Sequence, residues 1–309
     1  MRSLTFAGLL ACAVAAPGRG QAPDAGPLSL LLPGSTRAAA LGNAGVTGRD
    51  DDVVFYNPAQ LVGVRGGFSV TLARYSSRST LGEVTSSFTG GPLSLGWGVQ
   101  VVDYTAAPTE PYPFAQEVLT RKGIAAAQTM LGVLGAAMTY KGFKIGAAAK
   151  YAEDRVESGG NLTSQARGAH GSVLADAGVS HPLWQGVAGL SVQNFGRPSG
   201  VTGNRTGLPT QMLLGWTRGF QVGEFDLGLA TQVTARNGYV SPGAGAELGY
   251  SWIEGYNVVA RLGARQPESP SEHPVAIGGS FSADRFQLDY ALQFFDGGRN
   301  AHRFTIRWR

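Results

Sequence analysis

The chain has 309 residues and a formal net charge of +4, and only 15% of its residues are charged, against about 25% in typical soluble domains. Its basic residues are scattered, which argues against a nucleic-acid-binding surface, and its 46 glycines are roughly twice the usual share. Beyond the N-terminus no run of about 18 apolar residues occurs, which excludes a bundle of transmembrane helices.

Residues 1–22 (MRSLTFAGLLACAVAAPGRGQA) are typical of a secretory signal peptide, with Arg2 before an apolar core from Leu4 to Ala16. Cys12, the only cysteine, lies inside that core, so we expect the exported chain to carry no thiol or disulfide. A lipoprotein interpretation of LLAC is disfavoured, because the apolar run continues past Cys12 and little precedes it. The sequence therefore predicts export through a cleaved signal peptide.

Residues 23–66 follow no regular period and contain RDDDVVFYNPAQL, from Arg49 to Leu61. Local sequence leaves two interpretations of Asp50, Asp51 and Asp52. They form either a solvated charge run or the anchor of a folded segment, and in both cases Asn57-Pro58 starts a turn.

From residue 67 to the end the dominant period is two, the period of β-strands. In HRFTIRWR, for example, Phe304, Ile306 and Trp308 alternate with Arg303, Thr305, Arg307 and Arg309. The pattern predicts about fourteen strands, near residues 67–77, 80–89, 92–104, 128–140, 143–153, 171–180, 184–194, 209–219, 224–236, 243–254, 256–266, 274–282, 285–295 and 301–309.

An antiparallel transmembrane β-barrel explains these strands better than a soluble sandwich, whose strands also alternate. Many predicted strands are about ten residues long, and aromatic residues stand at the ends of several outer faces, namely Tyr75, Tyr104, Trp184, Trp216, Trp252 and Trp308. Tight turns alternate with longer links, as in a barrel with both termini in the periplasm. We place the tight turns at Gly90-Gly91, Lys141-Gly142, His181-Pro182, Phe220–Gly223, Glu254-Gly255 and Ala283-Asp284.

Catalytic and cofactor motifs are weak throughout the chain. The four histidines, His170, His181, His273 and His302, fall in separate loops or strand ends, so their spacing predicts no metal or catalytic cluster. GNAGVTG lacks the strand-before, helix-after context of a dinucleotide-binding loop. We therefore expect no enzyme activity, no cofactor and no metal site.

The stretch LLPGSTRAAALGNAGVTGRDDDVVFYNPAQL, residues 31–61, resembles the N-terminal signature of PorV/PorQ-type outer-membrane proteins, which belong with the FadL-like barrels. Asn43 and Gln60 depart from the family pattern, which usually has glycine at both positions. The matching motif residues are Arg37, Gly42, Gly45, Asp51, Asp52, Asn57, Pro58 and Ala59.

The resemblance implies a fourteen-strand outer-membrane barrel, residues 67–309, whose N-terminal segment, residues 23–66, folds inside the lumen as a hatch. The predicted strands turn a basic wall toward that lumen, and we expect the aspartates of the hatch to pair with it. Luminal glycines at Gly96, Gly98, Gly146 and Gly228 are expected to make room for the hatch. The basic wall consists of Arg261, Arg265, Arg303 and Arg307, with Arg309 at its end.

Two functions stay open at this point. PorV/PorQ-type proteins are accessory components of type IX protein secretion, which implies secretion-system proteins or cargo as partners. In that case, Tyr112 and Phe114 in PYPFAQEV form a candidate cargo-contact loop. FadL-like barrels instead carry hydrophobic small molecules, fatty acids among them, across the outer membrane. The polar link Asp154 to His170 argues mildly against such a transporter. Both functions place the chain among outer-membrane lipids.

Overall fold

Fourteen antiparallel strands close into a single barrel, in which each strand is bonded to its neighbours in the sequence and β1 is also bonded to β14. The computed structural model describes residues 28–75, 79–105, 124–158, 168–198, 208–236, 238–268 and 272–309. The strands are β1 (Gly67–Arg74), β2 (Thr80–Gly90), β3 (Leu93–Thr105), β4 (Ile124–Tyr140), β5 (Phe143–Ser158), β6 (Gly168–Leu183), β7 (Gly186–Pro198), β8 (Gln211–Val222), β9 (Phe225–Arg236), β10 (Tyr239–Ile253), β11 (Tyr256–Arg265), β12 (Glu272–Ala283), β13 (Phe286–Phe295) and β14 (Arg299–Trp308).

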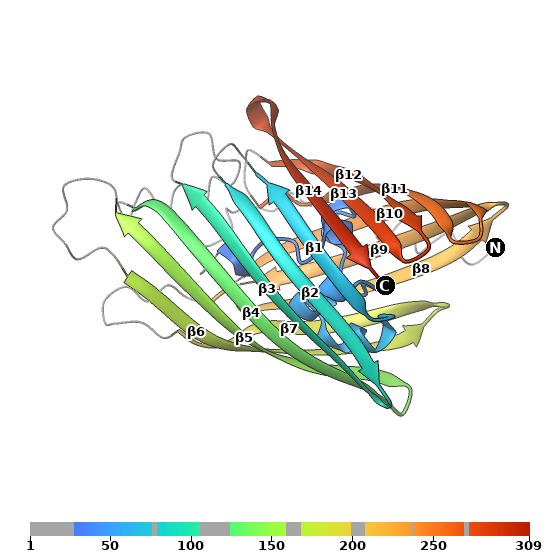
Figure 1. Ribbon diagram of the computed structural model, residues 1–309, viewed down its shortest axis with the longest axis horizontal. Coiled ribbons are helices and arrows are strands. Elements are labelled where there is room, and N and C mark those ends of the chain that lie inside the picture. The colour runs from blue at the N-terminus through green and yellow to red at the C-terminus, as the bar shows by residue number, and fades with distance from the viewer. Residues whose placement is uncertain are drawn as a thin grey trace.

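The predicted number and order of strands are confirmed, whereas some of their ends differ. The predicted turn at His181-Pro182 is wrong, because both residues lie in β6 and the chain reverses at Trp184-Gln185, which have φ angles of 51° and 60°. Pairing of β6 with β5 ends at Ser180, so the missing N–H of Pro182 interrupts no bond on that side. The tight turns gather at one end of the barrel (Figure 1).

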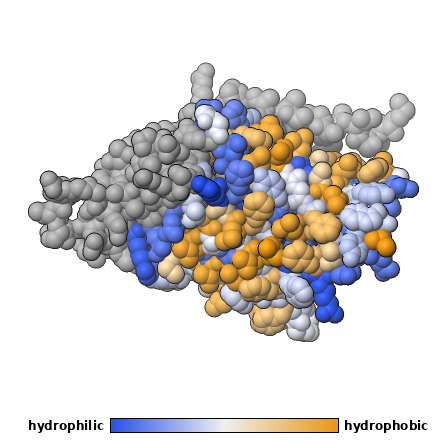
Figure 2. All heavy atoms as spheres, turned by 45° about the horizontal axis from the view of Figure 1, so that its top comes forward, coloured by the Kyte–Doolittle hydropathy of each residue, from blue (hydrophilic) through white to orange (hydrophobic). Residues whose placement is uncertain are grey.

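The outer wall of the barrel is apolar. On β1, Phe68 and Leu72 are 45% and 64% exposed, whereas the alternate residues Ser69 and Thr71 are buried in the lumen. Large apolar side chains spread over the visible face of the described residues (Figure 2). A continuous apolar exterior of this kind suits lipid tails and far exceeds the patches that soluble proteins expose.

Aromatic side chains at the strand ends agree only in part with the prediction. Trp184, Trp252 and Trp308 are 67%, 49% and 61% exposed, and Trp216 is half-buried. Tyr75 was predicted to lie on the outer face, and this prediction is wrong. Its side chain is 2% exposed and packs inward with Leu32 and other luminal residues. Ser69, Thr71 and Ala73 are the inward positions of β1, and Tyr75 continues their alternation, so its inward side follows from the period of two. The side chain of Tyr104 lies outside the described residues.

Residues 28–66, called the luminal segment below, lie inside the barrel (Figure 1). They form η1 (Leu28–Leu30), α2 (Thr36–Ala40), η2 (Asp51–Phe55) and η3 (Pro58–Gly63). Ser35 caps α2 by accepting a hydrogen bond from the Ala38 backbone N–H at 2.9 Å. Asn57 caps η3 in the same way, with Pro58 in the first helical position. No helix within the described ranges is long and apolar enough to cross a membrane.

The main apolar core lies between the luminal segment and the strands. Val54, Phe55 and Leu61 of the segment pack with Leu131 and Leu174 of the wall, and all five are at most 5% exposed. Residues 28–66 and the barrel thus share one core, which places the segment in a defined position.

Glycines of the wall line the path of the luminal segment. A Cβ atom added at any of them would come within 3.0 Å of a segment atom, so their absent side chains are what lets the segment approach the wall. Gly228 was expected in this set, but a Cβ there would meet the side chain of Glu247 on β10 instead. The set comprises Gly96, Gly98, Gly135, Gly146, Gly178, Gly189, Gly215, Gly243, Gly245, Gly263 and Gly278.

Substituting Gly146→Val should displace the luminal segment and leave the barrel folded. An added Cβ would lie 2.5 Å from the Ala59 backbone nitrogen and 2.6 Å from the Pro58 carbonyl carbon, and neither backbone atom can give way alone. Limited proteolysis should then cut residues 28–66, while the barrel keeps its heat-modifiable mobility in gels. Gly132→Val, on the neighbouring strand β4, is the matched control, since nothing lies within 4 Å of its Cβ position. Equal protease resistance of the two variants would contradict this packing.

Candidate functional site

Arg307 of β14 makes the first ionic attachment between the wall and the luminal segment, at the N-terminal end of η2. Its Nη2 lies 2.7 Å from Asp52 Oδ2, and its Nη1 contacts Asp289 of β13. Asp50 Oδ1 lies farther away, 3.9 Å from Nη1, and also 3.3 Å from Nη2 of Arg309. Arg307 and Asp52 are fully buried, so each charge depends on the other for compensation.

Arg37 makes the second ionic attachment, at α2. Its Nη2 and Nε donate to the two carboxylate oxygens of Glu247 on β10, at 2.5 Å and 3.0 Å, in the two-pronged geometry that suits arginine. Glu247 also contacts Nε of Arg261 at 3.3 Å, and Arg261 Nη1 lies 2.8 Å from Asp289 Oδ1. A chain of alternating charges therefore runs from Arg37 through the wall to Arg307.

All four arginines of the predicted basic wall are buried in the lumen, but most of them pair with acids of the wall itself. Arg303 lies 3.2 Å from Glu83 and donates to the Pro33 carbonyl at 2.6 Å. Arg265 pairs with Glu272. Sequence reasoning missed these partners, although Glu83, Glu247 and Asp289 all stand at lumen-facing positions of their strands.

The three aspartates of the luminal segment have different partners. Asp52 contacts Arg307 of β14 and Asp50 contacts Arg309 directly after it, as the sequence predicts. Asp51 instead accepts a hydrogen bond from Ser87 Oγ of β2 at 2.5 Å. The turn of η2 directs neighbouring side chains toward different strands, so a pairing of all three aspartates with one basic wall is wrong.

Neighbouring charges hold Asp50 and Arg37 of the luminal segment in their ionised forms. Burial alone would raise the pKa of Asp50, but the charges of Arg307, Arg37 and Arg309 outweigh it and hold that pKa well below its usual range. Burial likewise acts to lower the pKa of Arg37, and the Glu247 carboxylate more than offsets it. Because the Asp50 pKa is depressed, its contribution to stability is present above the unfolded pKa and is lost as pH falls through the folded one.

The remaining motif residues shape the luminal segment. Asn57 ties its two halves together, because its Nδ2 donates to the Val46 carbonyl at 2.6 Å while Oδ1 caps Ala59. Gly45 donates its N–H to Gln232 Oε1 of β9 at 2.9 Å. Gly42 has a φ of +65° and lies against the backbones of β10 and β11, so this position requires glycine.

The wall has an irregularity beside the luminal segment. In β7, Gln193 and Asn194 both stand opposite Asp176 of β6, which is a β-bulge, and Asn194 has a positive φ of 58°. Backbone pairing of β7 with β8 ends at Gln193. Beyond that point, the Asn194 side chain donates to the Pro209 carbonyl at 3.1 Å.

Lys150 of β5 connects this bulge to the luminal segment. Its Nζ lies 2.6 Å from Asp176 Oδ2, 3.2 Å from Asn194 Oδ1 and 2.8 Å from the Phe55 carbonyl. Gln193 Nε2 donates to the carbonyl of Tyr56. Sequence analysis missed Lys150, because only the bulge, which was not predicted, brings these groups together.

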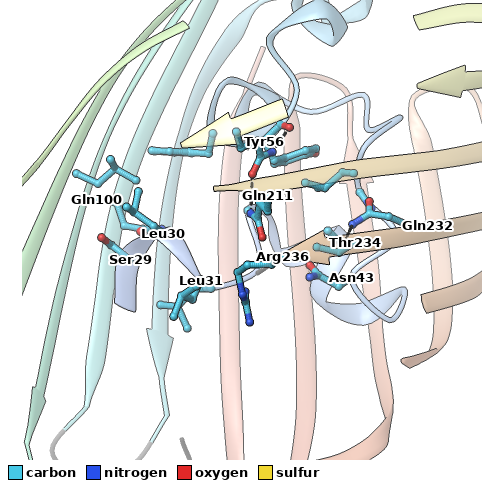
Figure 3. Close-up of a pocket in the computed structure, with 18 of the residues that line it drawn as sticks. Ser29, Leu30, Leu31, Asn43, Tyr56, Gln100, Gln211, Gln232, Thr234 and Arg236 are labelled. Carbon is cyan, nitrogen blue, oxygen red and sulfur yellow. Dashed lines mark hydrogen bonds between the residues drawn. The ribbon is translucent and has the colours of Figure 1, made fainter. Parts of the chain in front are cut away.

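A small polar cavity of about 40 Å³ lies between the luminal segment and the strands. Ser29, Leu30 and Leu31 line it from the segment, and Figure 3 shows them on the side of Gln100, with Gln211 and Arg236 farther across. Arg236 ends β9 and Gln211 begins β8, so the cavity lies toward the barrel end opposite the tight turns.

Histidines and metal ligands form no centre in the described part of the chain. His181 stacks on Phe143 and His302 contacts the Tyr290 hydroxyl, so they sit on different parts of the wall. No group of three or more His, Cys, Asp or Glu among the described residues is placed to hold a metal ion. Tyr112 and Phe114, and the predicted signal peptide, lie outside the described residues. The absence of enzyme activity stays a prediction.

Comparison with known proteins supports the fold. No protein-family model and no curated sequence matches the chain. The crystal structure of the Pseudomonas putida toluene transporter TodX superposes with a TM-score of 0.57 at 10% identity, covering 88% of this chain and 96% of TodX. A deltaS2 mutant of the TodX monoaromatic hydrocarbon channel gives 0.57 at 11% identity, over 89% and 97%. The chain therefore has the fold of these barrels, and PorV/PorQ membership stays a hypothesis.

Replacing Asp52 should loosen the luminal segment more than replacing Asp51. Asp52→Ala removes a buried partner of Arg307 and should cost about 3 kcal/mol of the free energy of opening, the low end for such a pair because Arg307 keeps Asp289. Asp51→Ala removes one hydrogen bond from a hydroxyl and should cost about 1.5 kcal/mol. Hydrogen exchange of residues 28–66 measures both values, and the reverse order would contradict the assignment of partners.

Proposed function

We propose that this chain is an outer-membrane barrel that passes small apolar molecules into the cell, with the luminal segment as its hatch. The observation that carries the proposal is the bulge of β7, where regular pairing of the wall stops beside the luminal segment. The apolar outer wall supports the membrane location. Export through the signal peptide of residues 1–22 is part of the same proposal.

A break in the wall suits apolar solutes better than polar ones. The luminal segment fills the barrel, so a straight aqueous path like that of an open porin is blocked. FadL-like barrels, to which the sequence bears a resemblance, release ligand through the wall beside a strand irregularity. Phe195, directly after the bulge, is 70% exposed on the outer wall, so a solute leaving there would enter an apolar environment.

The hatch and the bulge form a single unit. Lys150 bonds both Phe55 of the hatch and Asn194 of the bulge, and Gln193 of the bulge bonds Tyr56. Displacing residues 55 and 56 therefore breaks bonds that hold the irregular wall in place. This arrangement supports a mechanism in which movement of the hatch and opening of the wall occur together. TodX, a toluene transporter with the same fold, supplies the analogy for the solute class.

Deleting Asn194 should slow uptake of apolar solutes without altering the fold. The deletion leaves Gln193 alone opposite Asp176 and keeps Val192 and Phe195 facing outward, so the pairing of β6 and β7 becomes regular. Uptake of toluene into vesicles containing the purified barrel should fall at least about tenfold, a change of about 1.4 kcal/mol in the barrier. Asn194→Gly keeps the bulge, because glycine accepts the positive φ, and should retain most of the uptake. Undiminished uptake after the deletion would exclude a route through this bulge.

A role in type IX secretion is the second candidate. The motif residues that resemble the PorV/PorQ signature include Arg37, Asp52 and Asn57, which hold the luminal segment in the barrel. A segment held by buried ion pairs suits a permanently closed barrel whose outer loops contact secreted cargo. In that case, Tyr112 and Phe114 are the contact residues to test first.

Native mass spectrometry of the protein gently extracted from its own membrane separates the two candidates. Transport predicts a lone barrel that carries an apolar small molecule. Release together with a much larger protein would favour the secretion role instead and would identify the partner by mass. Double substitution of Tyr112 and Phe114 by serine should then dissociate that partner, whereas it should leave a small ligand in place.

A further inference from the structure

The polar cavity contains three buried atoms whose hydrogen-bonding capacity is unused. Within the described residues, Ser29 Oγ, Gln100 Oε1 and Arg236 Nε have no hydrogen-bond partner, and their residues are 5%, 2% and 4% exposed. All three residues line the cavity. Leaving such groups unpaired costs about 1–3 kcal/mol each, so the cavity is built to hold something that bonds to them.

These atoms specify both a donor and an acceptor in the occupant. Gln100 Oε1 can only accept, since it is a carbonyl oxygen, whereas Arg236 Nε can only donate. Ser29 Oγ can do either. The other Gln100 amide atom, Nε2, already donates to Glu83 at 2.8 Å, which fixes the orientation of the amide. A hydroxyl or amide group carries both a donor and an acceptor.

Charge in the cavity wall is balanced. Arg236 Nη2 lies 2.7 Å from Glu268 Oε2, and Lys150 Nζ lies 2.6 Å from Asp176 Oδ2. Each cation that lines the cavity therefore has its own carboxylate. An ionised ligand would enter without a counter-charge, so the occupant is uncharged.

Apolar side chains line part of the cavity, and the space is small. Leu30, Phe55, Leu131 and Leu213 line the cavity beside the polar atoms. A volume of about 40 Å³ holds a few non-hydrogen atoms, or about three to four water molecules at about 10–15 Å³ each. A benzene-sized body does not fit unless Ser29 and Leu30 of η1 move. The cavity thus accommodates the polar end of a molecule, and an apolar body can lie along Leu30, Leu131 and Leu213 once η1 moves.

We propose that this cavity binds the uncharged, hydrogen-bonding head, a hydroxyl or amide, of a small amphipathic molecule. The inference rests on the proposed passage of apolar molecules. It narrows the class of transported molecules, because the cavity should bind neutral amphiphiles more tightly than pure hydrocarbons or carboxylates. Gln100 and Arg236 recognise the head, and η1 covers it.

The test compares two isomers that differ only in the donor. Calorimetric titration of the full chain in amphipol with 1-hexanol should show saturable binding about fivefold tighter than that of methyl pentyl ether, the gain of one net hydrogen bond. Hexanoate should bind more weakly than hexanol. Gln100→Met removes the acceptor at similar volume and should abolish the preference for hexanol. Gln221→Met is the control, because Gln221 is an exposed residue near the tight-turn end of β8, away from the cavity.

Ser29→Ala is the second variant, should Gln100→Met unfold the barrel, and it should weaken hexanol binding about twofold to fivefold. Equal affinities for the alcohol and the ether, or no saturable binding because water alone fills the cavity, would overturn the site. Toluene uptake measured in the same preparations separates this inference from the proposed function. Uptake without a preference for hexanol contradicts the site alone, and a preference for hexanol without any uptake contradicts the transport function alone.

Discussion

The fully buried charge of Arg307 is the constraint on which the interior depends. Its guanidinium is met by Asp52 of the luminal segment and by Asp289 of β13, so one cation joins the segment to the wall. Burial of an uncompensated charge would cost several kcal/mol, so the buried carboxylate of Asp52 is held at the position of Arg307. The alternating charges continue through Arg261 and Glu247 to Arg37, so α2 and η2 of the segment are attached through one network.

The barrel could be predicted from the sequence because its two environments impose a period of two on every strand. Phe304, Ile306 and Trp308 face outward while Arg303, Thr305 and Arg307 are buried in the lumen, as the alternation requires. One error arose where a turn lies later than its sequence signal. At Trp184-Gln185 two non-glycine residues adopt positive φ, so the chain reverses beyond His181-Pro182. Such local conformations leave no mark in a pattern of alternation. Tyr75 was assigned to the outer face although the alternation places it inward with Ala73.

Of the candidate site, only the general pairing of acids in the luminal segment with arginines of the wall could be predicted. The sequence places aspartates ahead of a basic wall, and Asp52 does meet Arg307. Which acid meets which arginine depends on distances between strands far apart in the chain, so Glu247 as the partner of Arg37 could not be derived from spacing. The bulge at Asn194 does leave a mark, because Val192 and Phe195 face outward with two buried polar residues between them, but a strand predicted to end at residue 194 left that break in the alternation unread. The contacts of Lys150 with Asp176 and Asn194 at that bulge were therefore not predicted either.

The way in which the charges are shared bears on whether the luminal segment can move. Glu247 pairs with Arg261 as well as with Arg37, and Arg307 pairs with Asp289 as well as with Asp52. If the segment left the lumen, each wall residue would therefore keep one partner. The cost of displacement is then the loss of shared contacts and of the apolar core, rather than the much larger cost of isolated buried charges. A segment bound only by exclusive ion pairs would act as a fixed plug, whereas shared pairs are compatible with a hatch that opens and closes.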